Sequence, residues 1–256
     1  MRVTFSDAYD DIAAGSAKAR SYVAWWRAKY STIAPAVEAF VHERLFAISS
    51  AEVLAKHAEG SHALGEIERH RQLREVEDTR MPDTAMQDVF HRFVEERGLP
   101  TWQEFHDYLL EADIKPLILT PWWNDLRAKV ARYSEERVRD ALHWRIGRMY
   151  YSNMREVHFL ARVRELRGIQ LRYHIFADVR LRTDFWIDNH NVSVFLSNPE
   201  YRGASRTRKQ IAKERLDDHK PPLIFHEVEF PNRYDRGELY VVDDTAIEAL
   251  ADALDS

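Results

Sequence analysis

Apolar and polar residues repeat along the chain with two different periods. Up to Gly168 the apolar positions recur at steps of three and four residues, as in Val23, Trp26 and Tyr30, which is the spacing of one buried helix face. Beyond Gly168 apolar and polar residues alternate, which is typical of strands with one buried face. The pattern therefore predicts a helical N-terminal region followed by a region that mixes helices and strands.

The N-terminal region contains residue types that divide it into several helices. Pro35 is expected to kink or divide a helical stretch, and Thr101, with Glu104 three residues later, has the spacing of a capping box. The predicted helices cover residues 16–60, 61–77, 85–97, a segment after Thr101, and a long stretch from Trp122 through Gly147 toward Gly168.

The C-terminal region is expected to contain a helix, three strands, a helix and a strand, in that order. The polar run from Asp188 to Asn191 separates two strand-like segments and predicts a hairpin turn. A short edge strand and a final helix, capped by Asp244 or Thr245, are expected to follow. The six segments are residues 154–168, 171–182, 183–188, 192–198, 201–216 and 222–230, and the edge strand is Glu238–Val242.

Composition limits the class of protein. The chain has 256 residues, 45% hydrophobic and 31% charged, with a formal net charge of −5, as in soluble globular proteins. Because the chain has no cysteine, disulfides and thiolate zinc sites are excluded. No apolar run approaches the roughly 18 residues of a membrane span, and the N-terminus lacks the apolar core of a signal peptide. We therefore expect a cytoplasmic protein with no membrane segment.

Two acidic residues occupy positions that suit metal-dependent chemistry. Glu156 lies on the helix before the strands, and Asp184 starts the second strand, just ahead of the apolar run Phe185–Ile187. Metal-dependent phosphodiester cleavage needs carboxylates from separate elements at one edge of a small sheet, where they hold a cation against the scissile phosphate. Mg²⁺ suits such a site because it takes oxygen ligands and retains waters.

This element order and the two acidic positions resemble the restriction-endonuclease-like superfamily, the PD-(D/E)xK nucleases. The resemblance covers residues 150–230 and implies an αβββαβ core, in which a helix glutamate and a strand aspartate bind Mg²⁺ or Mn²⁺. Glu156 and Asp184 match these two positions. We therefore expect an α+β or α/β fold, with a helical domain over residues 1–149 and a nuclease-like α/β domain over residues 150–256.

The chain departs from the superfamily on the third strand, which usually carries an acid, one spacer and a lysine. The corresponding run, residues 192–198, has neither an acid nor a lysine. Members of the superfamily can relocate the lysine to the following helix, so Lys209 is the expected replacement. Asn198 or Ser197 is expected to supply a neutral oxygen ligand. The resemblance thus adds a neutral metal ligand and a catalytic lysine to the two acids.

The helix after the third strand carries the clearest positive charge in the chain. Phosphate contacts by Arg and Lys dominate nucleic-acid affinity, so this helix is expected to bind a nucleic-acid backbone. A solvated basic face, paired with acids elsewhere, is the alternative. The expected contacts are Arg202, Arg206, Arg208 and Lys213.

Two further features have both a structural and a functional interpretation. Glu227 and Glu229 alternate onto one face of the last strand, where they are either solvated or neutralise the basic helix. The pairs Trp25–Trp26 and Trp122–Trp123 lie on helical segments, so one ring of each pair is expected in the core and the other at a domain boundary or partner surface. For these indoles core packing is favoured over base stacking.

Three hypotheses about function follow. The leading one is metal-dependent cleavage of nucleic acid, DNA in preference to RNA, with the helical region positioning the duplex or recruiting a protein partner. The second is a catalytically inactive nuclease-fold module for nucleic-acid binding or complex assembly, which the missing acid-x-lysine pair supports. The third is an α+β protein with no role toward nucleic acid.

Overall fold

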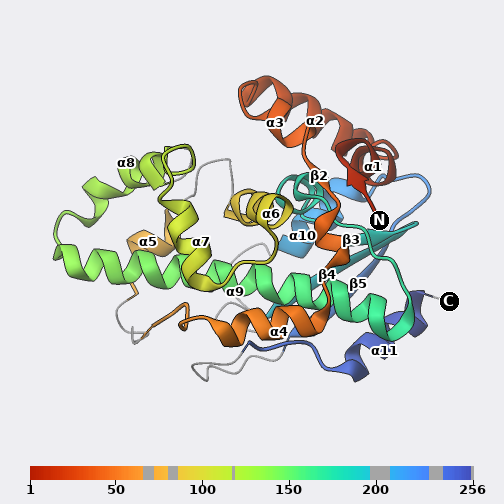
Figure 1. Cartoon of the computed structure of the whole chain (residues 1–256). Helices are drawn as coiled ribbons and strands as arrows, with labels where there is room; N and C mark the ends of the chain where they lie inside the picture. Colours follow the sequence, from red (N-terminus) through yellow and green to blue (C-terminus); the bar gives the residue numbers. More distant parts are fainter. Residues whose placement is uncertain (66–71, 80–85, 117–118, 197–207, 231–238, 255–256) are drawn as a thin grey trace. The chain divides into compact units, whose positions relative to one another are not determined.

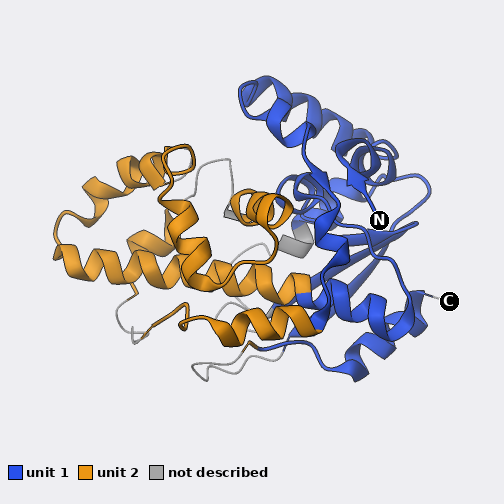
Figure 2. Cartoon of the chain, in the orientation of Figure 1, with its two compact units in different colours: residues 1–50, 158–234, 240–256 blue, residues 51–157, 235–239 orange. Residues whose placement is uncertain are grey.

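The computed structural model describes residues 1–65, 72–79, 86–116, 119–196, 208–230 and 239–254. It is a mixed α/β structure with more helix than strand (Figure 1). Contacts between residues divide the chain into two compact units, which Figure 2 colours separately. Unit 1 contains Met1–Ser50, His158–Tyr234 and Tyr240–Ser256, and unit 2 contains Ala51–Val157 and Asp235–Leu239.

This division differs from the boundary expected between residues 149 and 150, which falls inside one continuous helix, α9 (Glu135–Arg167). N-terminal residues group with C-terminal ones because they share polar contacts. Asp11 accepts hydrogen bonds from the Arg172 guanidinium at 2.5 Å and from the Trp186 indole at 2.8 Å. These partners are 161 and 175 positions away in the chain, a separation that local periodicity does not reveal.

Unit 1 begins with a two-stranded sheet and short helices, and it continues beyond α9 with a three-stranded sheet. Its N-terminal elements are β1 (Val3–Thr4), α1 (Phe5–Ala8), the π-helix η1 (Tyr9–Ala13), α2 (Ala17–Lys29), α3 (Ala34–Glu38), β2 (Val41–His42) and the 3-10 helix η2 (Arg44–Ala47). Its C-terminal elements are the π-helix η4 (Ala177–Leu181), β3 (Phe185–Ile187), β4 (His190–Leu196), α10 (Arg208–Leu216), β5 (Ile224–Phe230) and α11 (Asp244–Leu254).

The three-stranded sheet has the order β3-β4-β5. β3 and β4 are antiparallel and form the predicted hairpin, whereas β4 and β5 are parallel, and α10 lies in the connection between them. A parallel pair needs such a crossover because the chain has to return to the end of the sheet from which it started. On the other side of β3, Arg172 forms an isolated antiparallel bridge with Trp186.

The α9 helix covers one face of this sheet within unit 1. The ring of Phe159 lies 5.4 Å from that of Phe185 on β3 and 6.2 Å from that of Phe230 on β5. All three side chains are buried. Because side chains alternate along a strand, Phe185 and Phe230 identify the face of the sheet that packs against the helix.

The strand expected over residues 171–182 is wrong apart from the single bridge at Arg172. The chain then turns into a helix that ends with η4, and Arg182 closes it with a left-handed φ of 67°. The reason is burial on all sides, since the consecutive side chains of Phe176–Asp178 are all enclosed. The alternation of polar and apolar residues indicated a one-sided burial that this segment does not have.

Three helical predictions and one strand prediction also need correction. In the stretch 61–77, residues 61–65 and 72–73 are not helical, and the helix that the structure describes there is α5 (Arg74–Asp78). The stretch 16–60 is interrupted by β2 and η2, and the long helix expected from Trp122 is two helices separated at residues 131–134. Residues 239–242 of the expected edge strand form no strand, and Glu238 lies outside the described residues.

Unit 2 is helical over the ranges that are described. Its helix α7 starts as predicted, because the Thr101 hydroxyl accepts the Glu104 N–H at 3.2 Å and the Glu104 carboxylate accepts the Thr101 N–H at 2.7 Å. None of the described helices is long and apolar enough to cross a lipid bilayer. The helices are α4 (Ser50–Glu59), α5 (Arg74–Asp78), α6 (Met86–Arg97), α7 (Trp102–Leu109), α8 (Leu119–Val130) and the first part of α9.

Three positions of α9, spaced by four residues, enclose the backbone of Ala63. The His143 ring donates from Nε2 to the Ala63 carbonyl at 2.8 Å, and the Tyr151 hydroxyl accepts the Ala63 N–H at 3.0 Å. Between them, a Cβ added at Gly147 would lie 2.3 Å from the Ala63 carbonyl oxygen. Glycine is therefore required at this helical position by the close approach of another backbone.

We predict that Gly147→Ala lowers the free energy of unfolding by about 1–3 kcal/mol, because overpacking outweighs helix propensity. In an unobstructed helix the same change stabilises by about 1 kcal/mol, so the sign of the effect tests the close approach. The measurement is denaturant unfolding followed by circular dichroism. Gly60→Ala is the control, since a Cβ there meets its nearest neighbour at 3.4 Å. Stabilisation by Gly147→Ala would contradict the contact with Ala63.

Two histidines are buried next to each other in unit 1. The rings of His42 and His174 are fully shielded from solvent, and their centres lie 5.3 Å apart. Nδ1 of His174 accepts the Phe176 N–H at 3.0 Å, and Nε2 donates to the Phe40 carbonyl at 3.2 Å. Burial lowers the pKa of His174 to about 4. Burial, followed by the charge of His174, lowers the pKa of His42 well below its usual value. Both rings are therefore neutral in the folded protein.

We predict that the free energy of unfolding falls as the pH is lowered from 6.5 toward 4. The unfolded His174 takes up a proton near pH 6.5, whereas the folded ring does so only at about pH 4, so acid favours the unfolded state. Over that window the loss from His174 is about 3 kcal/mol. Unfolding titrations at pH 7 and pH 4 measure it.

The control for this prediction is an accessible histidine. His174→Gln should reduce the loss between the two pH values, whereas His106→Gln, at a side chain with 40% exposure, should leave it unchanged. An equal loss in both variants would rule out His174 as its source.

Candidate functional site

Asp184 immediately precedes β3, and its carboxylate lies against the backbone of β4. The side chain is buried, and Oδ2 accepts the Val194 N–H at 2.9 Å. The neighbouring Thr183 hydroxyl accepts a hydrogen bond from the buried Asn191 amide at 2.8 Å. These two contacts tie the start of β3 to β4. Asp184 therefore has a structural role in addition to any chemical one.

The parallel pairing of β5 brings two acids next to the same part of β4. Ser193 is the ladder partner of Glu227, and Phe195 is the partner of Glu229, so all four side chains project from one face. Lys213 on α10 forms an ion pair with Glu227 at 3.2 Å. The sequence left open whether Glu227 is solvated or neutralises the basic helix, and this ion pair shows that it binds a cation of that helix.

Asp184, Ser193, Glu227 and Lys213 together form what we call the sheet-edge site. Two carboxylates and a hydroxyl are the oxygen donors that a hard divalent cation prefers, and an ammonium group suits a phosphate. The ion pair has to open before Glu227 can bind a metal. Its side chains are 50% and 40% exposed, and an exposed ion pair contributes at most about 1 kcal/mol. Opening it is therefore a minor cost.

Only some of the other predicted site residues lie within the described ranges. Arg208 and Lys209 are the first residues of α10, which agrees with their predicted place on a helix after the third strand. Their predicted contacts with phosphate stay predictions. The predicted residues that lie outside the described ranges are Asn198, Ser197, Arg202 and Arg206.

Glu156 lies on α9 in unit 2, two residues before the part of the helix that belongs to unit 1. Its Oε1 accepts a hydrogen bond from the Ser152 hydroxyl at 3.5 Å, one helical turn earlier. Burial lowers the pKa of the adjacent Arg155 to about 10, and the charge of Glu156 opposes that shift. Because Asp184 belongs to unit 1, one metal ion shared by these two carboxylates stays a prediction.

The arrangement of the His, Asp and Glu side chains bears on whether a metal ion can bind. In the part of the chain that the structure describes, no group of three or more His, Asp or Glu side chains is arranged to hold a metal ion. Mg²⁺ is often bound through one or two carboxylates together with waters and substrate phosphates. A metal site that includes Asp184 therefore stays a prediction.

His190 and His226 form a stacked pair on the opposite face of β4 and β5. Nδ1 of His190 and Nε2 of His226 are 2.8 Å apart, and the ring planes are inclined by 20°. Partial burial, followed by the charge of His190, lowers the pKa of His226. Since side chains alternate along strands, this pair faces away from Ser193 and Glu227 and does not belong to the sheet-edge site.

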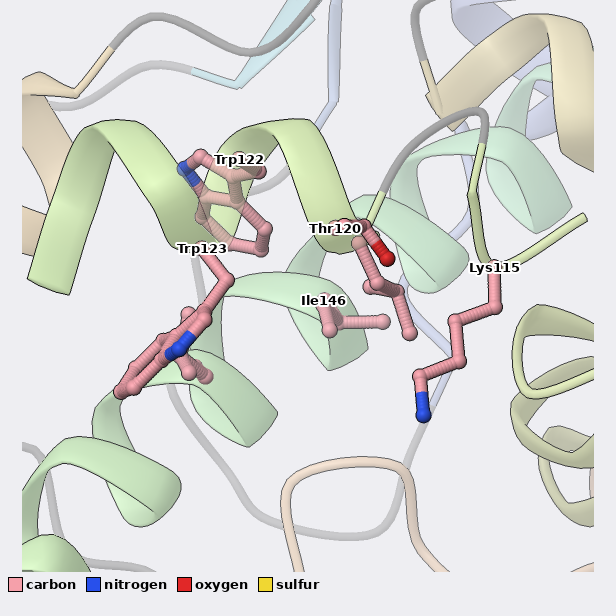
Figure 3. Close-up of a pocket in the computed structure, with 7 residues that line it drawn as sticks. Lys115, Thr120, Trp122, Trp123 and Ile146 are labelled. Atoms are coloured by element: carbon pink, nitrogen blue, oxygen red, sulfur yellow. The ribbon is translucent and has the colours of Figure 1, made fainter.

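Unit 2 contains an apolar pocket of about 290 Å³ between α8 and α9. Figure 3 shows the indole rings of Trp122 and Trp123 on one side of the pocket and Lys115 on the other. Trp122 is buried and Trp123 is 44% exposed, as expected for one ring of each tryptophan pair. The lining residues are Lys115, Leu119, Thr120, Trp122, Trp123, Leu142 and Ile146. None of these described lining residues is Asp, Glu or His.

Comparisons of the chain with protein-family models, with curated proteins and with solved structures give no match. The class of the protein therefore has to be inferred from its own strand order and side chains. Of the two candidate places, the sheet-edge site offers charged side chains, and the pocket of unit 2 offers apolar surface.

We predict that Asp184→Ala lowers the free energy of unfolding by about 1–3 kcal/mol, because the part-buried Val194 N–H loses its acceptor. Asp184→Asn keeps an oxygen at this position and should lose less. Urea titrations measure both, with Asp188→Asn as a control in the exposed turn, where φ is 48° and asparagine is well tolerated. If Asp184→Ala is as stable as the wild type, the carboxylate does not support the hairpin.

Proposed function

We propose that this protein acts on nucleic acid through a nuclease-like domain over residues 150–256, and that its reaction is Mg²⁺- or Mn²⁺-dependent phosphodiester cleavage. The supporting observation is the element order α9, bridge at Arg172, β3, β4, α10, β5. It corresponds to the αβββαβ order if the bridge stands for a shortened first strand. An antiparallel pair followed by a parallel pair, with a helix in the crossover, is the part of this order that supports the proposal most.

The position of Asp184 supports the chemical part of the proposal. It immediately precedes the second strand of this order, and its carboxylate accepts a hydrogen bond from the third strand. A bound divalent cation would polarise a phosphate oxygen and activate a water. Asp184 would hold that cation, with Glu156 and Asn198 as the further proposed ligands. Lys209 would assist at the phosphate.

The phosphate backbone would be held by cations of α10. Lys213 is half-exposed and is paired only across the surface with Glu227, so a phosphate can replace that carboxylate at low cost. Arg208 belongs to the same helix. Arg202 and Arg206 precede it in the sequence and are the other proposed contacts.

The second candidate is a non-catalytic module for nucleic-acid binding or complex assembly that keeps the same fold. Two observations favour it. The third strand carries Ser193, Val194 and Phe195 where an acid and a lysine are usual. The hydrogen bond from Val194 to Asp184 also gives the aspartate a reason to be buried without any metal.

We predict that the purified protein cleaves DNA in the presence of Mn²⁺ and that Asp184→Asn lowers the rate by about 100-fold or more, since loss of even an outer partner of a metal costs about 10- to 100-fold. Asn is preferred to Ala at this position because it retains an acceptor for the Val194 N–H. Asp188→Asn is the matched control and should cleave like the wild type.

The outcomes separate the two candidates. Equal cleavage by wild type and Asp184→Asn would assign the activity to a contaminant or another site. If the protein does not cleave, and calorimetry shows no heat of Mn²⁺ binding that depends on Asp184, the non-catalytic module is favoured. Equal activity on an RNA of the same sequence would remove the preference for DNA.

A further inference from the structure

The exposed face of α2 is strongly basic in a chain that is acidic overall. The helix carries four Lys or Arg residues and neither Asp nor Glu, whereas the whole chain has a net charge of −5. All four cations are exposed. Two of them, Lys18 and Arg27, pair with Asp217 and Glu38. Lys29 has no acidic partner in the described ranges, so the C-terminal turn of α2 keeps positive charge.

Aromatic rings lie among these cations. Trp25 is 48% exposed, and its ring centre lies 5.4 Å from that of Tyr22 and 6.1 Å from that of Tyr30. The Lys29 ammonium lies 4.9 Å from the centre of the Trp25 ring. The adjacent Trp26 is fully buried, so the exposed indole is not needed to fill the core. We call Tyr22, Trp25, Lys29 and Tyr30 the α2 aromatic face.

This face lies beside the basic helix α10. The Arg215 guanidinium lies 4.0 Å from the centre of the Tyr22 ring. The Ser16 hydroxyl, which caps α2, donates to the Arg215 carbonyl at 3.1 Å, and Asp218 accepts the N–H groups of Ala17 and Lys18 at 3.0 and 3.2 Å. α10 itself carries four cations and a single acid. The two helices therefore combine positive charge with the exposed Trp25 ring in one part of unit 1.

We propose that the α2 aromatic face binds unpaired bases of a single-stranded nucleic acid, whose backbone is held by the cations of α2 and α10. This inference rests on the proposed function. It adds that the nucleic acid is single-stranded, and it names the residues that bind its bases. Every base has a π-face, so an exposed indole beside a cation binds a strand without regard to sequence. A base in a duplex is stacked between its neighbours and cannot reach Trp25. The strand is therefore bound where it is unpaired.

The test is fluorescence anisotropy with a labelled single-stranded oligonucleotide and with the duplex of the same length, without divalent metal. Trp25→Ala should weaken binding of the single strand about 5- to 100-fold, since each stacked base is worth that much in alanine substitutions. Trp25→Phe should restore most of the affinity. Lys29→Ala should flatten the slope of log affinity against log salt by about 0.7, the value for one phosphate contact on a single strand.

Trp123→Ala is the matched control, because this indole is 44% exposed and belongs to unit 2. It should bind like the wild type, and circular dichroism should show that every variant is folded. If Trp25→Ala and Trp123→Ala bind equally well, the inference is overturned while the proposed function stands. If the duplex binds as tightly as the single strand and depends equally on Trp25, stacking on unpaired bases is excluded.

Two further outcomes distinguish this inference from the proposed function. A loss of binding in Trp25→Ala, in a protein that does not cleave, supports the aromatic face and contradicts the nuclease. Failure of the wild type to bind any nucleic acid overturns both. Competition by polyglutamate as strong as that by oligonucleotide would assign the face to an acidic polypeptide and overturn the inference.

Discussion

The parallel pairing of β4 with β5 is the constraint on which the rest of unit 1 depends. Parallel strands cannot be joined by a tight turn, so the chain has to cross over between them, and α10 lies in that crossover. The pairing places Ser193 beside Glu227, and the crossover brings Lys213 within 3.2 Å of Glu227. The contacts of Arg215 with α2 then anchor the aromatic face next to the same helix. The hydrogen bonds between β4 and β5 thus determine where the sheet-edge site lies and where the α2 aromatic face is anchored.

Local chemistry predicts an element well where the element is stabilised by its own residues. Thr101 and Glu104 cap each other's backbone, and the polar turn that begins at Asp188 joins two strands that pair directly. The prediction for residues 171–182 was wrong because that segment is enclosed by partners from distant parts of the chain. The alternation of polar and apolar residues in this segment indicated burial of one face only, whereas both faces are buried. The same reason explains the unit boundary, since Asp11 joins unit 1 through residues more than 160 positions away.

The candidate site was predictable to the extent that it depends on sequence order. Asp184 was recognised from its place before an apolar strand, and in the structure it immediately precedes β3. The sequence offered neutralisation of the basic helix as one alternative for Glu227, but it did not identify Lys213 as the partner, because that pairing depends on the register between β4 and β5 and on the path of α10. Trp25 belonged to a recognised tryptophan pair, and the helical angle between neighbours indicated that one ring would lie in the core and the other at a domain boundary or partner surface. The cations around it come from a second helix that no local pattern connects to α2.

The measurement that tests the β4–β5 pairing most directly is disulfide cross-linking, because the chain has no cysteine of its own. Directly paired strand residues have Cα atoms roughly 5 Å apart, within the range that a disulfide spans. Oxidation should join Ser193→Cys to Glu227→Cys in the folded protein and should leave Ser193→Cys with Val228→Cys unjoined, since the latter two face opposite sides of the sheet. Mass spectrometry without reductant distinguishes them. Cross-linking only in the second pair, or in neither, would contradict the parallel register and with it the nuclease-like strand order.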